Sequence, residues 1–138
     1  VLDIGTGSGA IAVSLKKSRP MWQVTASDLS ADALVLAKDN AKLNRVDISF
    51  VLADVFENVS GCFDIIVSNP PYISENDKDE VGLNVLTSEP KMALFADKDG
   101  LAIYRQILED ADKYLNSQGK LYFEIGYNII CIVQACTV

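Results

Sequence analysis

Two hydrophobic periods alternate along the chain. Short runs of consecutive apolar residues, typical of strands buried on both faces, occur at about 1–4, 22–27, 48–52, 63–68 and 120–125. Segments with apolar residues at steps of three and four lie between the runs and predict helices over about 10–17, 31–43 and 101–115. This alternation predicts an α/β fold, with an open, mostly parallel, doubly wound sheet and crossover helices.

The same spacing predicts which faces of two helices are buried. In the second helix, which Ser30 is expected to cap, the predicted buried residues are Ala33, Leu36, Ala37 and Ala41. In the third helix, which Gly119 is expected to end, they are Leu101, Tyr104, Leu108, Ala111 and Leu115.

Both ends of the chain are interpreted as internal. The first strand begins at Val1 without a lead-in, and residues 129–138 are apolar up to the last residue, whereas natural domains usually end in polar, exposed segments. Residues 1–138 are therefore expected to form one domain that is truncated at both ends. Residues 73–100, which include seven acidic residues and three lysines, are too long for a simple connection and predict a functional loop.

Composition excludes several functions. The 138 residues contain 19 acidic and 12 basic side chains, and the net charge of −7 argues against direct binding of nucleic acid. No apolar run reaches the ~18 residues of a membrane span, so no membrane partner is expected. The chain has no histidine, and its three cysteines lack C-x-x-C spacing, so no metal site is predicted. The cytoplasm is the expected location, although an organelle stays open.

A glycine-rich turn separates the first strand from the first helix. Gly5, Gly7 and Gly9 stand at alternate positions, where they let the backbone turn sharply and approach a ligand. In a doubly wound sheet such a turn lies at the carboxyl edge, where ligands bind. Because Gly5, Gly7 and Ala10 also satisfy G-x-G-x-x-[GA], a nicotinamide dinucleotide site stays open at this point.

Three acidic residues stand at the ends of successive predicted strands. Asp28 comes 23 residues after Gly5, where a carboxylate can accept both hydrogen bonds of a ribose diol. Asp54 is placed to accept a hydrogen bond from an adenine amino group. Asp3, beside the glycines, would repel a pyrophosphate but suits a cationic ligand such as the ammonium and sulfonium of S-adenosylmethionine.

The fourth strand runs into an Asn-Pro-Pro-Tyr motif at 69–72. Two prolines make the turn rigid and direct carbonyl oxygens outward, and Asn69 adds a side-chain carbonyl. Tyr72 adds an aromatic face. This combination predicts a site that accepts both hydrogen bonds of a planar NH₂ group and holds the group flat for reaction.

These motifs resemble those of a known family. The pattern D-x-G-x-G-x-G at 3–9 resembles the first motif of class I S-adenosylmethionine-dependent methyltransferases, which have a Rossmann-like fold. The motif at 69–72 resembles that of enzymes that methylate adenine or cytosine in DNA, guanine in ribosomal RNA, or glutamine in release factors. The E-P-x-x-A-L element at 89–94 and Phe-Glu-Ile-Gly at 123–126 resemble the last group, the HemK-type peptide-chain release factor glutamine methyltransferases.

The resemblance implies that residues 1–138 are a methyltransferase catalytic domain, truncated at both ends and without its last strands. It also implies an activity and a set of site residues. It implies methyl transfer from S-adenosylmethionine to the side-chain amide nitrogen of a glutamine, with a release factor as the protein partner. It implies that Asn69, Pro70 and Tyr72 are catalytic and that they contact the substrate together with Pro71 and Glu89. The implied cofactor-binding residues are Asp3, Gly5, Thr6, Gly7, Gly9, Asp28, Asp54 and Asn69.

Three other interpretations stay open. A nucleic-acid amino methyltransferase would share the chemistry, an NAD-binding dehydrogenase domain would share the glycine turn, and an inactive fragment would at most bind cofactor. The chain also departs from the family pattern, because it ends in apolar residues 129–138 where the family continues with a polar helix and two strands. The family's amino-terminal helical domain is likewise not part of this sequence.

Overall fold

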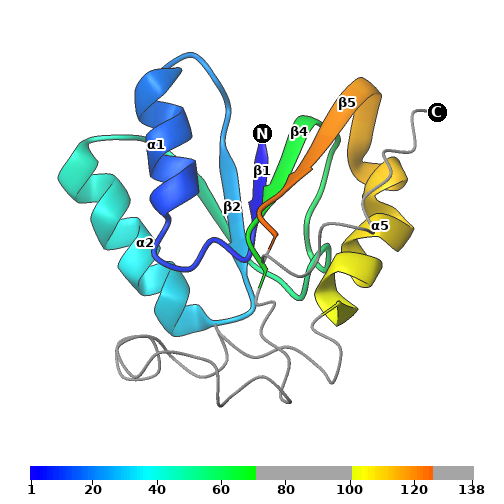
Figure 1. Cartoon of the computed structure of the whole chain (residues 1–138). Coiled ribbons are helices and arrows are strands. Elements are labelled where there is room, and N and C mark those ends of the chain that lie inside the picture. The colour runs from blue at the N-terminus through cyan, green and yellow to red at the C-terminus, as the bar shows by residue number, and fades with distance from the viewer. Residues whose placement is uncertain (71–100, 126–138) are drawn as a thin grey trace.

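The computed structural model describes residues 1–70 and 101–125 and shows a parallel sheet between two layers of helices (Figure 1). The strands follow the order β3-β2-β1-β4-β5, and every neighbouring pair is parallel. The strands are β1 (Leu2–Ile4), β2 (Thr25–Asp28), β3 (Ser49–Leu52), β4 (Phe63–Ser68) and β5 (Leu115–Phe123). The helices are α1 (Ala10–Ser18), α2 (Ala31–Asn44) and α5 (Ala102–Tyr114). The predicted α/β class is confirmed.

The core has one apolar cluster on each face of the sheet. Figure 1 shows α1 and α2 on one face and α5 on the other. On the α5 face, Leu2 and Ile4 of β1 pack with Ile66 of β4 and Ile107 of α5. Since side chains alternate along a strand, Asp3 points to the opposite face, toward α1. The cluster on that opposite face comprises Ala12, Val13, Val24, Ala26, Ala41 and Ile48.

The predicted buried faces were partly wrong. Leu36 of α2 and Leu108 of α5 are exposed, by 51% and 44%. The inner positions are taken instead by Leu34 of α2 and Ile107 of α5, so each buried face is rotated around its helix relative to the prediction. The predicted cap is confirmed, because the Ser30 hydroxyl oxygen accepts the Ala33 N–H at 3.2 Å.

Two element boundaries also differ from the prediction. The second strand begins at Thr25, because Trp22 closes a turn in which its N–H donates to the Arg19 carbonyl at 2.9 Å. Gly119 lies within β5 and does not end α5, which stops at Tyr114. The pairing of β4 with β5 shifts register between Phe63 and Ile65, opposite the segment that contains Gly119, and a Cβ atom added at Gly119 would lie 2.8 Å from the Asn116 carbonyl oxygen.

The predicted functional loop at 73–100 and the apolar tail at 129–138 lie outside the described residues. Among the helices that the structure describes, none has the length and apolar character needed to cross a bilayer.

Candidate functional site

The site lies where the strand order reverses. After β1 the chain crosses to β2 on one side, whereas β4 and β5 extend the sheet on the other. Ligands of doubly wound sheets bind in the crevice that such a reversal opens at the carboxyl ends of the strands. Ile4 and Ser68, the last residues of β1 and β4, are paired in register, and the Ser68 hydroxyl donates to the Ile4 carbonyl at 2.8 Å. This pairing brings the glycine turn beside Asn69.

Each glycine of the turn has a positive φ angle, but their surroundings differ. A Cβ atom added at Gly5 (φ 68°) or Gly7 (φ 54°) would meet nothing within 4 Å. A Cβ atom at Gly9 (φ 80°) would lie 3.0 Å from the Ala37 Cβ of α2. Gly5 and Gly7 therefore border open space at the carboxyl edge of the sheet, whereas Gly9 packs against a helix.

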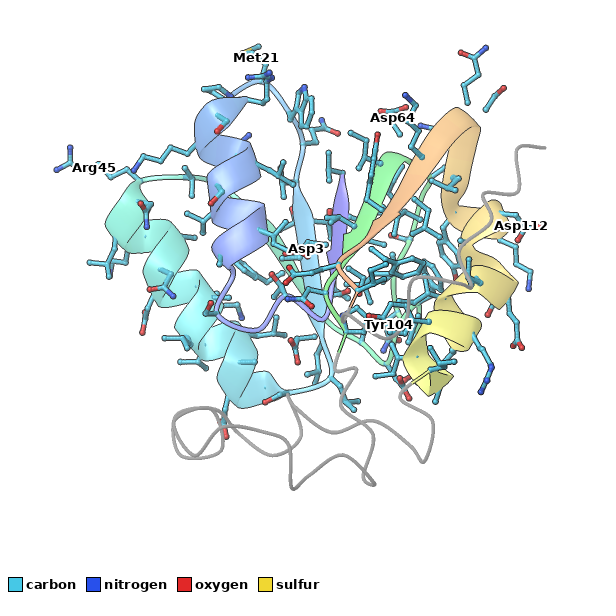
Figure 2. All side chains as sticks on the ribbon, in the orientation of Figure 1. Asp3, Met21, Arg45, Asp64, Tyr104 and Asp112 are labelled. Carbon is cyan, nitrogen blue, oxygen red and sulfur yellow. The ribbon has the colours of Figure 1, made fainter. Side chains whose placement is uncertain are left out.

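Asp3 lies in β1, next to the glycine turn (Figure 2), and binds the turn through one carboxylate oxygen. Its Oδ2 accepts the Thr6 hydroxyl at 2.6 Å and the Ala12 N–H of α1 at 3.2 Å. The residue is only 1% exposed, and among the described residues Oδ1 has no hydrogen-bond partner. Burial raises the pKa of Asp3 from 3.8 to about 6, against the lowering effect of its hydrogen bonds with Thr6 and Ala12.

Asp28, at the end of β2, also forms a hydrogen bond with the glycine turn. Its Oδ2 accepts the Gly7 N–H at 2.8 Å, and its Oδ1 accepts the Ser30 N–H at the same distance. A carboxylate has about four lone-pair sites, so each oxygen of Asp28 retains the capacity to accept one hydroxyl of a diol. Since Asp28 is only half-buried, this capacity is accessible.

The remaining predicted site residues lie after β3 and β4. Asp54 is exposed two residues beyond β3, and its carbonyl accepts the Glu57 N–H at 2.9 Å. Asn69 is exposed directly after β4, and Pro70 is fully buried. The end of β5 supports β4, because the Ser68 carbonyl accepts the Glu124 N–H at 3.0 Å. The Tyr104 hydroxyl of α5 in turn donates to the Glu124 carbonyl at 2.7 Å.

The described structure thus brings most of the predicted residues to one edge of the sheet. Pro71, Tyr72 and Glu89 lie outside the described residues. No cluster of three or more potential metal ligands occurs in the described part of the chain. Sequence reasoning missed Asn40, whose side chain reaches the turn from α2, and also the role of Ser68. Ser68 stood out as a polar residue at the end of an apolar strand, but no local pattern distinguished Asn40.

The fold and this site define the class. The structure is similar to that of ribosomal protein L11 methylase from Lactobacillus delbrueckii subsp. bulgaricus, with a TM-score of 0.63 and 27% identity over 88% of this chain and 48% of that chain. It also shares its fold with a methyltransferase from Pyrococcus furiosus, with a TM-score of 0.66 and 23% identity over 91% of this chain and 54% of that one. The fold is that of the Rossmann-like class I methyltransferases.

Residues 1–97 match the family model described as the methyltransferase small domain, and the chain belongs to this family. It is 63% identical over 127 residues to a release factor glutamine methyltransferase of Streptococcus pneumoniae, covering 92% of this chain and 46% of the relative. It is 50% identical to the Lactococcus lactis subsp. lactis protein of the same name, covering 98% of this chain and 50% of the relative. The resemblance predicted from the motifs is confirmed, and the chain spans about half the length of these relatives.

Proposed function

We propose that this chain provides the catalytic site of an enzyme that methylates the side-chain amide of a glutamine in a peptide-chain release factor, with S-adenosylmethionine as the methyl donor. One observation carries the proposal. The register of β1 and β4 sets the glycine turn beside Asn69 and Pro70, which supports a donor site and an amide site at the same edge of the sheet. The names of the relatives described above support this substrate, and a cytoplasmic location remains part of the proposal.

The residues around the turn fit S-adenosylmethionine. Open space beside Gly5 and Gly7 leaves room for a ligand to approach the backbone. The half-buried Asp28 carboxylate fits the ribose diol, and the exposed Asp54 would accept from the adenine amino group. Among the described residues Asp3 Oδ1 has no hydrogen-bond partner, and an unpaired acceptor next to the turn favours a ligand with a cationic group over one with a pyrophosphate.

The amide site has to overcome the weak nucleophilicity of an amide nitrogen, whose lone pair is delocalised into the carbonyl. Asn69 would accept one N–H of the glutamine with its side-chain oxygen, and the Pro70 carbonyl would accept the other. Two acceptors hold the NH₂ group in one orientation and raise the electron density on nitrogen as its bond to carbon forms. Tyr72 and Pro71 are proposed to pack against the amide, and Glu89 is proposed to help close the loop beside it.

When bound, S-adenosylmethionine supplies an activated methyl group, which leaves its sulfur as a neutral thioether. The new C–N bond would form as the C–S bond breaks, the sulfur would keep the electron pair, and one amide proton would pass to solvent. Asn69 and Pro70 would stabilise the positive charge that develops on the nitrogen, because their oxygens would accept hydrogen bonds from its two hydrogens. The reaction requires no strong base, which is consistent with a chain that contains no histidine.

Replacing Asn69 tests this role. We expect Asn69→Ala to lower kcat by ~10²–10³, the size seen when one preorganised polar group is removed from an active site. Affinity for S-adenosylmethionine should stay within about twofold, because Asn69 acts on the acceptor side. The measurement is single-turnover methyl transfer to a release factor, with cofactor binding followed by calorimetry. Asn116→Ala, a change at the opposite end of the sheet, is the matched control, and a wild-type rate in Asn69→Ala would refute the proposed clamp.

The alternative interpretations predict different results in the same assays. A nucleic-acid substrate would make methyl transfer steeply dependent on salt, with a loss of ~10³–10⁵ in affinity between 50 and 200 mM when several phosphates are contacted. A protein glutamine predicts only a shallow dependence. An NAD-binding domain would bind the dinucleotide in preference to S-adenosylmethionine, and a calorimetric titration with each ligand separates the two.

A further inference from the structure

The glycine turn is also held from α2, by two residues that belong to none of the motifs. The Asn40 side-chain Nδ2 donates to the Ser8 carbonyl at 2.8 Å. Three residues earlier, and therefore on the same face of the helix, the Ala37 Cβ lies 3.0 Å from the position that a Cβ at Gly9 would occupy. α2 thus contacts both Ser8 and Gly9.

The Ser8 carbonyl has no partner within α1, because Ser8 precedes the N-cap of that helix. The first hydrogen bond of α1 runs from the Val13 N–H to the carbonyl of the N-cap residue, Gly9, at 2.8 Å. The Asn40 amide, on the neighbouring helix α2, supplies a donor for the Ser8 carbonyl.

The hydrogen bonds of the turn then form a connected set. The peptide group between Ser8 and Gly9 is fixed at both ends, since its N–H donates to the Thr6 carbonyl at 2.8 Å and its carbonyl accepts from Asn40. The peptide group between Thr6 and Gly7 is fixed in the same way, because its N–H donates to Asp28 Oδ2 at 2.8 Å. Asn40 therefore fixes the turn at Ser8, whereas Asp3 and Asp28 fix it at Thr6 and Gly7.

We infer that Asn40 is a positioning residue for the cofactor turn: through the Ser8 carbonyl it sets the orientation of the Ser8–Gly9 peptide group and prepares the turn for its ligand. The ligand named in the test, S-adenosylmethionine, rests on the proposed function, but the ordering of the turn does not. Without the Asn40 side chain, the Ser8 carbonyl would hydrogen-bond to water. The turn would then become ordered only when the cofactor binds, and this ordering would lower the affinity.

The test compares Asn40→Ala with Asn44→Ala in the intact protein. Asn44 is a matched control, because it lies one turn further along α2 and also donates to a backbone carbonyl, that of Asn40, at 2.9 Å. It bonds to Lys17 of α1 at 3.1 Å and not to the glycine turn. We expect Asn40→Ala to weaken S-adenosylmethionine binding roughly three- to tenfold, the effect of one hydrogen bond, whereas Asn44→Ala leaves it unchanged.

Two further readouts separate positioning from a general loss of stability. In the cofactor-free protein, hydrogen exchange of the Gly7 and Gly9 amides should accelerate in Asn40→Ala by a similar factor and not in Asn44→Ala. In turnover, KM for the cofactor should rise while kcat at saturation stays within about twofold. Asn40→Asp, which has no N–H at neutral pH and repels the carbonyl, should lose at least as much affinity as Asn40→Ala.

The outcomes distinguish this inference from the proposed function. Wild-type affinity and wild-type exchange in Asn40→Ala or Asn40→Asp would overturn the positioning role. Equal losses in Asn40→Ala and Asn44→Ala would also overturn it, because they would show that only helix stability is affected. A wild-type protein that binds no S-adenosylmethionine would refute the proposed function, whereas the exchange experiment would still decide the role of Asn40.

Discussion

Replacing Asp3 with asparagine is expected to change how the stability of the protein depends on pH. In the folded protein the Asp3 carboxyl group is buried next to the glycine turn, and one of its oxygens has no hydrogen-bond partner among the described residues. Burial raises its pKa from 3.8 to about 6, so the folded protein holds the proton more tightly than the unfolded chain does. The free energy of unfolding contributed by this group therefore falls as the pH rises from below 3.8 to above 6.

The size of the effect follows from the shift in pKa. A difference of about two pKa units corresponds to about 3 kcal/mol of destabilisation at ~1.4 kcal/mol per unit. The folded protein is not destabilised by Asp3 at a pH below both pKa values, and it is destabilised by the full amount at a pH above both. Between pH 4 and pH 7.5, about 2.5 kcal/mol of this change is accessible. Relative to Asp3→Asn, the wild-type protein should therefore lose about 2.5 kcal/mol of stability as the pH is raised over this range.

Chemical denaturation of both proteins at several pH values measures this difference. Asparagine keeps an oxygen that accepts from Thr6 and Ala12, and its other effects on stability do not depend on pH. They cancel when the difference in unfolding free energy is compared across the range. The other carboxylates titrate in both proteins and cancel in the same way. A difference that stays constant between pH 4 and pH 7.5 would refute the burial of an ionisable group at this position.

Two further predictions concern Asp28 and Gly9 of the candidate site. Asp28→Ala should weaken S-adenosylmethionine binding by ~2–3 kcal/mol, because charge-assisted hydrogen bonds are lost. Asp47→Ala, at an exposed position after α2, should leave the affinity unchanged. Unchanged affinity of Asp28→Ala in calorimetry would show that Asp28 is not part of the site. Gly9→Ala should destabilise the protein more than Gly61→Ala, because both glycines have similar φ angles, 80° and 86°, but only Gly9 faces another atom within 4 Å. The strain common to both costs ~1–2 kcal/mol, and equal denaturation midpoints would show that the contact with Ala37 is unimportant.

The sequence was sufficient to predict the sheet and the edge that carries the site. Apolar runs marked all five described strands, and β4 (Phe63–Ser68) coincides with its predicted range. The acids after β2 and β3 and the motif after β4 could be assigned to one edge, because the carboxyl ends of parallel strands meet there. Helix faces were less well predicted, since several apolar residues in a row, such as Val35 and Leu36, leave the orientation of the helix to tertiary packing.

Two contacts that shape the turn could not be predicted from the sequence, because they join residues that are distant in the chain. Asn40 and Ser8 are 32 positions apart, and Asp28 and Gly7 are 21 apart. Only the packing of α2 against α1 decides that Asn40 meets a carbonyl, and the small side chains of Ala37 and Ala41 permit that packing. Asp3, predicted as a cofactor contact, makes its described hydrogen bonds with Thr6 and Ala12. The motif residues and Asn40 therefore form one hydrogen-bonded unit, in which the glycines supply the flexible backbone and side chains from β1, β2 and α2 fix its shape.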